Sequence, residues 1–100
     1  MTEKKRHEFG KHYLVEFTGC DAGRLGTVEA VRGPFLEAAR VSGATLLGSQ
    51  FHQFEPHGVS AMIFIAESHF SLHTWPEHNY AAFDVLTCGV MDAQKAIDHL

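Results

Sequence analysis

Hydrophobic and polar residues alternate along several short stretches of the chain, as they do in strands with one buried face. In residues 12–17, Tyr13, Val15 and Phe17 fall on one side. Further strands are predicted at 45–54, 59–66, 71–75 and 80–87, and residues 59–66 are apolar enough to be buried on both faces. A turn of Glu, Pro, His and Gly at 55–58 separates two of these strands.

Two other stretches have helical spacing. Apolar residues recur every three or four positions over 25–41, and Gly43 provides a left-handed cap. The Gly33-Pro34 pair interrupts this stripe. It predicts either a kink or a restart with Pro34 at the first helical position, because proline lacks the backbone donor. A second helix is predicted over 93–100, with Asp92 as its N-cap.

The order β-α-β-β-β-β-α predicts an α+β fold. We expect one domain over residues 1–100, a two-layer sandwich with an antiparallel sheet and helices on one face. A chain of 100 residues buries a thin core, which favours oligomerisation. Residues 1–11 are interpreted as a charged, mobile lead-in.

Composition narrows the function classes. The formal net charge is -4, with only eight Lys plus Arg, which argues against a nucleic-acid binder. No stretch approaches the roughly 20 apolar residues of a membrane span. The first 12 residues lack a signal-peptide core, so we expect a cytoplasmic protein. Cys20 and Cys88 are far apart in sequence and are predicted to be free thiols.

The most informative segment is 66–77, Ala-Glu-Ser-His-Phe-Ser-Leu-His-Thr-Trp-Pro-Glu. It resembles the self-processing site of bacterial and archaeal S-adenosylmethionine decarboxylase proenzymes. Three more blocks sit where that family has them: Gly-Val-Ser at 58–60, Tyr-Ala-Ala-Phe-Asp at 80–84 and Thr-Cys-Gly at 87–89. The resemblance covers about residues 10–100. Four blocks at consistent spacing are highly specific, whereas any one of them would not be.

The resemblance implies cleavage between Glu67 and Ser68. A serine hydroxyl placed against the preceding carbonyl attacks with an effective concentration on the order of 10⁵ M in favourable cases, converting the amide to an ester. The family pattern gives the roles of oxyanion stabiliser and proton shuttle to Ser60 and His73. The implied products are a β chain of residues 1–67 and an α chain of residues 68–100, in which Ser68 has become a pyruvoyl group.

In the family, the pyruvoyl group forms a Schiff base with S-adenosylmethionine, and the product is the aminopropyl donor for polyamine (spermidine) biosynthesis. By resemblance, Cys88 protonates the substrate carbon; its ordinary thiol pKa of about 8.5 suits that task. Glu77 is the expected ligand of the ribose hydroxyls, and Phe54 and Trp75 are the expected stacking rings. A ring face attracts a fixed cation by about 0.5–2 kcal/mol.

Each of these residues also has an ordinary structural interpretation. Cys88 can be a small buried hydrophobe, Glu77 a solvated loop carboxylate, and Phe54 a core residue. The alternatives to the main interpretation are a pyruvoyl-dependent decarboxylase of ornithine or arginine, and a non-catalytic dimeric or metal-binding module. We expect no metal ion, because His69 and His73 lie about 13 Å apart on an extended segment.

The resemblance also implies a homodimer. In the family, two protomers pack sheet against sheet in a four-layer α/β/β/α arrangement and complete each other's active sites. Two features depart from the family pattern: the Gly33-Pro34 break, and the last residue, Leu100, which falls within a helix that the family continues and follows with one more strand.

Overall fold

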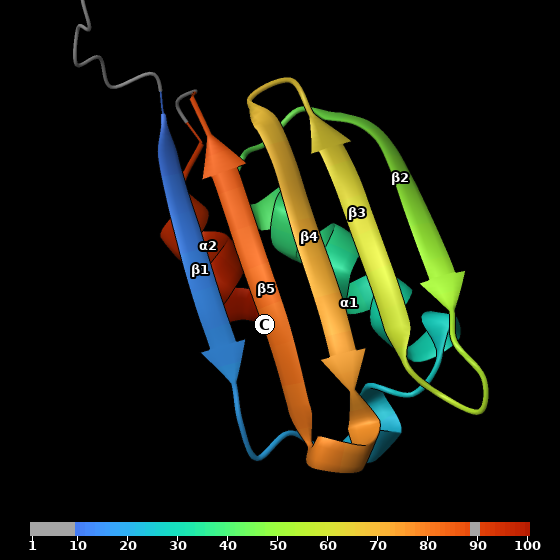
Figure 1. Ribbon diagram of the computed structural model, residues 1–100. Helices are drawn as coiled ribbons and strands as arrows, with labels where there is room; N and C mark the ends of the chain where they lie inside the picture. Colours follow the sequence, from blue (N-terminus) through green and yellow to red (C-terminus); the bar gives the residue numbers. More distant parts are fainter. Residues whose placement is uncertain (1–9, 89–90) are drawn as a thin grey trace, which may run out of the picture.

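The computed structural model describes residues 10–88 and 91–100. Five antiparallel strands form one sheet in the order β1-β5-β4-β3-β2 (Figure 1). The elements in chain order are β1 (Lys11–Phe17), the 3₁₀ helix η1 (Ala22–Arg24), α1 (Val28–Val41), β2 (Leu46–Gln53), β3 (Val59–Ile65), β4 (Ser68–Trp75), the 3₁₀ helix η2 (Pro76–His78), β5 (Tyr80–Thr87) and α2 (Ala93–His99).

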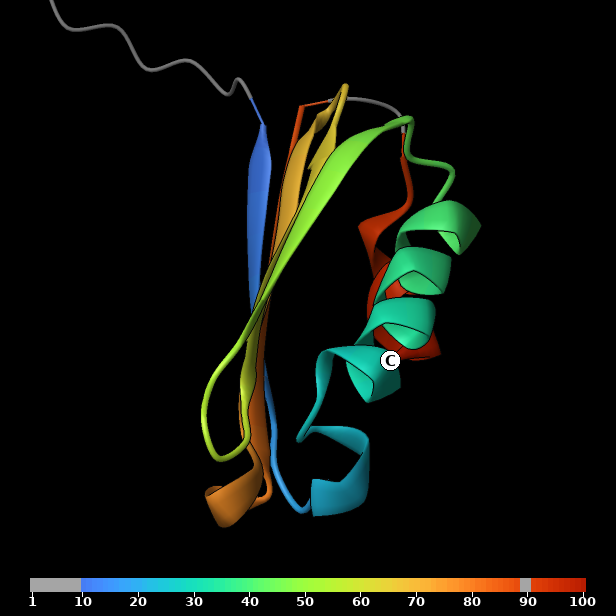
Figure 2. The same ribbon diagram turned by 90° about the vertical axis from the view of Figure 1, so that its right-hand side faces the viewer.

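Both α-helices cover the same face of the sheet, and none of the described residues forms a helix over the other face, here called the open face (Figure 2). The core lies between these two layers. Phe35 of α1 is fully buried and meets Phe70 of β4 and Phe83 of β5 edge-on, at ring-centroid distances of 6.5 and 6.0 Å. Burying one such ring contributes about 1.5–3 kcal/mol. The predicted two-layer α+β sandwich is confirmed.

The helix α1 differs in detail from the sequence prediction. It begins at Val28 rather than near Leu25, because the Thr27 side chain caps it by accepting the Ala30 N–H at 3.2 Å. It also runs through Pro34 as one helix, so of the two predicted outcomes, a kink or a restart, the restart at Pro34 is wrong. The missing proline N–H is offset by packing, since Phe35 on the same helix is fully buried.

Two further boundaries shift. β4 begins at Ser68 rather than Ser71, so a connection of only Ala66 and Glu67 joins it to β3. β1 begins at Lys11, inside the predicted lead-in. Residues 1–9 of that lead-in and the glycine of the Thr-Cys-Gly block lie outside the described residues. Within the described ranges, no helix is long and apolar enough to cross a membrane.

Candidate active site

The turn between β3 and β4 holds Glu67 by its side chain. Its carboxylate accepts the backbone N–H of Thr45 at 3.0 Å and the Thr45 hydroxyl at 3.4 Å. The neighbouring Ala66 N–H donates to the Thr45 carbonyl at 2.9 Å. Thr45 leads into β2, so the end of the α1–β2 connection fixes the turn in place.

The main-chain carbonyl of Glu67 is held from the other side by Cys88, which follows β5. The Cys88 N–H donates to this oxygen at 2.9 Å, and the Cys88 thiol lies 3.2 Å from the same oxygen. The peptide carbonyl between Glu67 and Ser68 therefore has two donors. Donors aimed at a carbonyl oxygen stabilise the negative charge that develops there when a nucleophile attacks.

Ser68 has a strained backbone. Its φ is 147°, a region that residues with a side chain rarely adopt, and a residue held there costs about 1–3 kcal/mol. Its nitrogen belongs to the same peptide bond as the Glu67 carbonyl. The strained residue and the carbonyl that accepts from Cys88 therefore belong to the same peptide bond, the one between Glu67 and Ser68 at which cleavage was predicted.

Ser60 and His73 form a second pair. They face each other across β3 and β4, and Ser60 Oγ lies 2.8 Å from His73 Nδ1. His73 lies five positions after Ser68 along the extended strand, a distance of about 17 Å. The structure brings Ser60 and His73 together, and it brings Glu67 and Cys88 together. Within one chain it keeps the two groups apart.

The predicted substrate-binding residues gather near the Ser60–His73 pair, at the end of the sheet that carries η2, the lower end in Figure 1. Trp75 follows His73 on the open face, and its ring centroid is 5.5 Å from that of Tyr80. Glu77 in η2 lies 3.3 Å from His57 Nε2. Trp75 and Phe54 are 43% and 47% exposed, so both are available for contacts outside the chain.

Tyr80 belongs to the same aromatic group. Burial raises the pKa of its hydroxyl, and the neighbouring Glu16 carboxylate raises this pKa further. The phenol therefore stays protonated and can serve as a donor at this end of the sheet. A shallow hollow of about 710 Å³ on the open face is lined by Tyr80, His73 and residues of β1 and β5.

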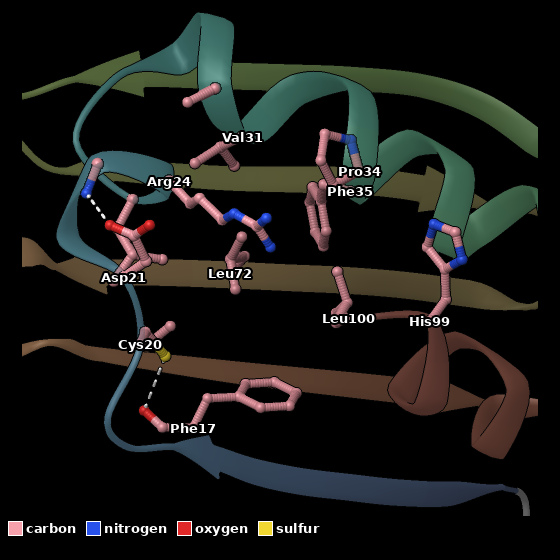
Figure 3. Close-up of a pocket in the computed structure, with 14 residues that line it drawn as sticks. Phe17, Cys20, Asp21, Arg24, Val31, Pro34, Phe35, Leu72, His99 and Leu100 are labelled. Atoms are coloured by element: carbon pink, nitrogen blue, oxygen red, sulfur yellow. Dashed lines mark hydrogen bonds between the residues drawn. The ribbon is translucent and has the colours of Figure 1, made fainter.

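A second cavity lies on the helix side of the sheet. It has a volume of about 590 Å³ and is lined mainly by apolar side chains, among them Phe35, Leu72 and Leu100, and the Arg24 side chain extends into the middle of this group (Figure 3). Neither Ser68 nor Cys88 lines it. It is therefore not where the predicted cleavage chemistry takes place.

Comparison with known proteins bears directly on this site. A sequence model of the S-adenosylmethionine decarboxylase family matches residues 11–100. This chain belongs to that family. The resemblance seen in the four sequence blocks is confirmed.

The relatives are close in sequence. The chain is 50% identical over 92 residues to the S-adenosylmethionine decarboxylase proenzyme of Thermococcus onnurineus, covering 91% of this chain and 65% of that protein. It is 47% identical over 92 residues to the proenzyme of Thermotoga petrophila, covering 91% and 71%. The chain spans 64–66% of the length of the matched Thermococcus and Pyrococcus relatives.

A solved structure agrees with the fold. The crystal structure of the adenosylmethionine decarboxylase from Aquifex aeolicus VF5 superposes with a TM-score of 0.84 at 39% sequence identity, covering 91% of this chain and 76% of that one. The α+β arrangement is therefore that of an S-adenosylmethionine decarboxylase.

Sequence reasoning missed one residue of this site, Thr45, which holds the Glu67 carboxylate. Nothing in the sequence links these two residues, since they are 22 positions apart and become neighbours only when β2 pairs with β3. The contact between the Cys88 thiol and the Glu67 carbonyl was also not predicted. It depends on where β5 ends relative to the β3–β4 turn.

Proposed function

We propose that this chain is a self-processing decarboxylase that cuts itself between Glu67 and Ser68 and then acts on S-adenosylmethionine. The observation that carries the proposal is the pair of donors, the N–H and the thiol of Cys88, on the Glu67 carbonyl oxygen. An ordinary turn carbonyl needs one partner. Two donors at a strained serine favour attack on that carbonyl carbon.

The processing step follows from these contacts. The Ser68 hydroxyl attacks the Glu67 carbonyl carbon, and the Cys88 donors stabilise the resulting oxyanion. The C–N bond breaks, the Ser68 nitrogen takes a proton, and an ester links the two residues. A base then removes the α-proton of Ser68. Elimination releases the Glu67 carboxylate and leaves dehydroalanine, which tautomerises and takes up water to give ammonia and a pyruvoyl group.

Backbone strain supports the same step. Attack by Oγ requires Ser68 to turn its side chain toward the preceding carbonyl, and this orientation is set by rotation about its N–Cα bond. The φ of 147° already departs from ordinary strand geometry. Part of the strain is released when the peptide bond is exchanged for an ester, which raises the energy of the starting state relative to the product.

The base in this scheme is His73, supplied by a second copy of the chain. Within one protomer His73 lies about 17 Å from Ser68 along β4. A two-fold axis between two open faces, perpendicular to the strands, places the Ser68 end of one sheet over the His73 end of its partner. The open face carries exposed apolar side chains that such packing would bury, among them Leu14, Phe64 and Trp75.

The residues around Ser68 suit a pyruvoyl group. Ser68 pairs with Thr87 in the sheet, so the new terminus would stay beside Cys88 after cleavage. β4 also pairs with β3, which holds fragments 1–67 and 68–100 together. When present, the pyruvoyl group supplies a carbonyl that withdraws the electron pair left as CO₂ departs. The Cys88 thiol, no longer engaged with the Glu67 carbonyl, then delivers a proton to the substrate carbon.

Substrate binding is proposed at the lower end of the partner's sheet. Glu77 offers a carboxylate for the ribose hydroxyls, and the half-exposed rings of Trp75 and Phe54 offer faces for adenine and the sulfonium. The decarboxylated product would be the aminopropyl donor for spermidine synthesis. A reducing cytoplasm would keep Cys88 as the thiol that both steps need.

The test is CO₂ release by purified, processed protein. Carboxyl-labelled S-adenosylmethionine, ornithine and arginine are supplied separately, with Ser68→Ala protein as the control. We expect CO₂ from S-adenosylmethionine alone and none from the variant. Faster CO₂ release from ornithine or arginine would overturn the assignment of S-adenosylmethionine as the substrate. No release from any of the three by fully processed chain would overturn the decarboxylase proposal.

A further inference from the structure

Three side chains with metal-binding atoms meet on the open face, on three neighbouring strands. His12 of β1, His69 of β4 and Asp84 of β5 place one ligand atom each within 4.8 Å of the others. His12 Nε2 lies 2.5 Å from Asp84 Oδ2, and His69 Nε2 lies 3.5 Å from the same oxygen. None of these three residues has a role in the proposed chemistry.

The sheet register sets this cluster. His12 and His69 both pair with Leu86, one from each side of β5, and Asp84 lies two residues from Leu86. Residues two apart on a strand point to the same face. The two imidazoles therefore converge on the Asp84 carboxylate because the backbone pairing places them there.

The Asp84 carboxylate is oriented by a further contact. The hydroxyl of Ser71, its cross-strand partner, donates to Oδ1. This leaves Oδ2 directed at the two histidines. Metal-binding carboxylates and imidazoles are commonly held by such outer hydrogen bonds, which fix the ligand atom that faces the ion.

We propose that His12, His69 and Asp84 form a binding site for a divalent transition-metal ion such as Zn²⁺. Two imidazole nitrogens and one carboxylate oxygen are a common three-ligand set for zinc, with water in the fourth position. Tetrahedral ligands about 2.0–2.1 Å from zinc lie about 3.3 Å apart. The His69–Asp84 separation of 3.5 Å already matches this spacing.

The His12–Asp84 contact must lengthen to admit an ion. At 2.5 Å it is a hydrogen bond, and it would open by about 0.8 Å on metal binding. Within one protomer the His12 side chain is 45% exposed, so its ring can shift without displacing a core residue of its own chain. The sequence analysis considered His69 with His73, which lie too far apart along one strand to share an ion. In the proposed site the second histidine is His12, which comes from β1, so this distance does not apply.

A bound ion would link β1 to β4 across β5. β1 is an edge strand that pairs only with β5 among the described strands. Metal binding should therefore raise the melting temperature, by about 5 °C or more at saturation. This inference does not rest on the proposed function, because all three ligands come from one chain and none takes part in cleavage or decarboxylation.

The experiment is a titration of the metal-free protein, with both fragments present if it has cut itself, with Co²⁺, followed by visible absorption, with Zn²⁺ as competitor. We expect one ion per chain and the strong absorption of a four-coordinate site, without a thiolate-to-cobalt charge-transfer band from Cys20 or Cys88. Asp84→Asn, which keeps the Ser71 contact, and His12→Ala should each weaken binding at least tenfold. His78→Ala removes an exposed histidine outside the cluster and should leave binding unchanged.

Two outcomes would overturn the site. One is no Co²⁺ or Zn²⁺ binding at micromolar concentrations, in which case the cluster is only a hydrogen-bonded network. The other is binding that survives both His12→Ala and Asp84→Asn, which would place the ion elsewhere. Ser71→Ala gives a second readout, because losing the carboxylate's outer hydrogen bond should weaken binding about 10–100-fold while leaving all three ligands present.

Discussion

The thiol of Cys88 lies 3.2 Å from the carbonyl oxygen of Glu67, which also accepts the Cys88 backbone N–H at 2.9 Å. From the sequence, Cys88 was assigned only to protonation of the substrate carbon. This contact extends its proposed role to processing. One side chain would then serve two steps in turn, because cleavage removes the carbonyl that engages it.

Cys88→Ala should therefore slow self-cleavage as well as turnover. The variant keeps the N–H donor and loses the thiol, a weak donor, so we expect processing to slow about tenfold or more. Cys88→Ser keeps a donor at the same place and should process faster than Cys88→Ala. The rate is measured from the loss of intact chain on denaturing gels. Processing of Cys88→Ala at the wild-type rate would restrict Cys88 to the decarboxylation step.

Strain at Ser68 can be measured by comparing two inactive variants. Ser68→Ala and Ser68→Gly both lack the nucleophile and should stay whole. Glycine tolerates a φ of 147°, so Ser68→Gly should be more stable than Ser68→Ala by about 1 kcal/mol in denaturant unfolding. The control is Ala82→Gly in the Ser68→Ala background. At position 82, in an ordinary strand, replacing alanine by glycine should lower the free energy of unfolding by about 0.5–1 kcal/mol. Lower stability of Ser68→Gly would argue against strain.

If each active site contains Ser68 of one protomer and His73 of its partner, two inactive variants should restore cleavage when they form a mixed dimer. Ser68→Ala lacks the nucleophile and His73→Ala lacks the base, so neither should cut itself alone. After the two are mixed, unfolded and refolded together, random pairing puts about half of the chains in mixed dimers. In those dimers the His73→Ala chain should be cut and the Ser68→Ala chain should not. No cleavage in the refolded mixture would place His73 outside the processing site or refute the dimer.

The Gly33-Pro34 pair shows how proline is accommodated inside α1. A residue before proline is disfavoured in helical conformation because its Cβ meets the proline ring, and glycine has no Cβ. In the Ser68→Ala background, Pro34→Ala should raise the free energy of unfolding by about 1–3 kcal/mol. Gly33→Ala should raise the free energy of unfolding by about 1 kcal/mol, the usual helix preference of alanine over glycine, only when Pro34→Ala is also present. Additive effects would contradict this explanation.

Most of the fold could be predicted from local patterns, since alternation located the five strands and the three-to-four spacing located both helices. The predicted ends of helices and strands were wrong where a specific contact determines where the element begins. Capping by Thr27 starts α1 at Val28, and the two-residue turn at Ala66-Glu67 extends β4 back to Ser68. The Thr27 cap is a local signal that the apolar stripe beginning at Leu25 outweighed in the prediction, whereas the start of β4 depends on its pairing with β3 and β5.

For the candidate site, too, some features could be predicted from the sequence and others depend on the folded structure. Family resemblance pointed to Ser68, Cys88, Ser60 and His73, but their spatial separation into two groups follows only from strand register. The cluster of His12, His69 and Asp84 was not predicted, because residues 72 positions apart become neighbours only through the pairing of β1 with β5. The sequence suggested metal binding only through histidines close together in the chain.

The central claim is cleavage of the bond between Glu67 and Ser68, and intact mass spectrometry of purified protein tests it most directly. We expect two fragments, residues 1–67 and residues 68–100, the second blocked at its amino terminus by a pyruvoyl group, and one intact mass for Ser68→Ala. A single full-length mass for the wild-type chain after prolonged incubation would contradict the account.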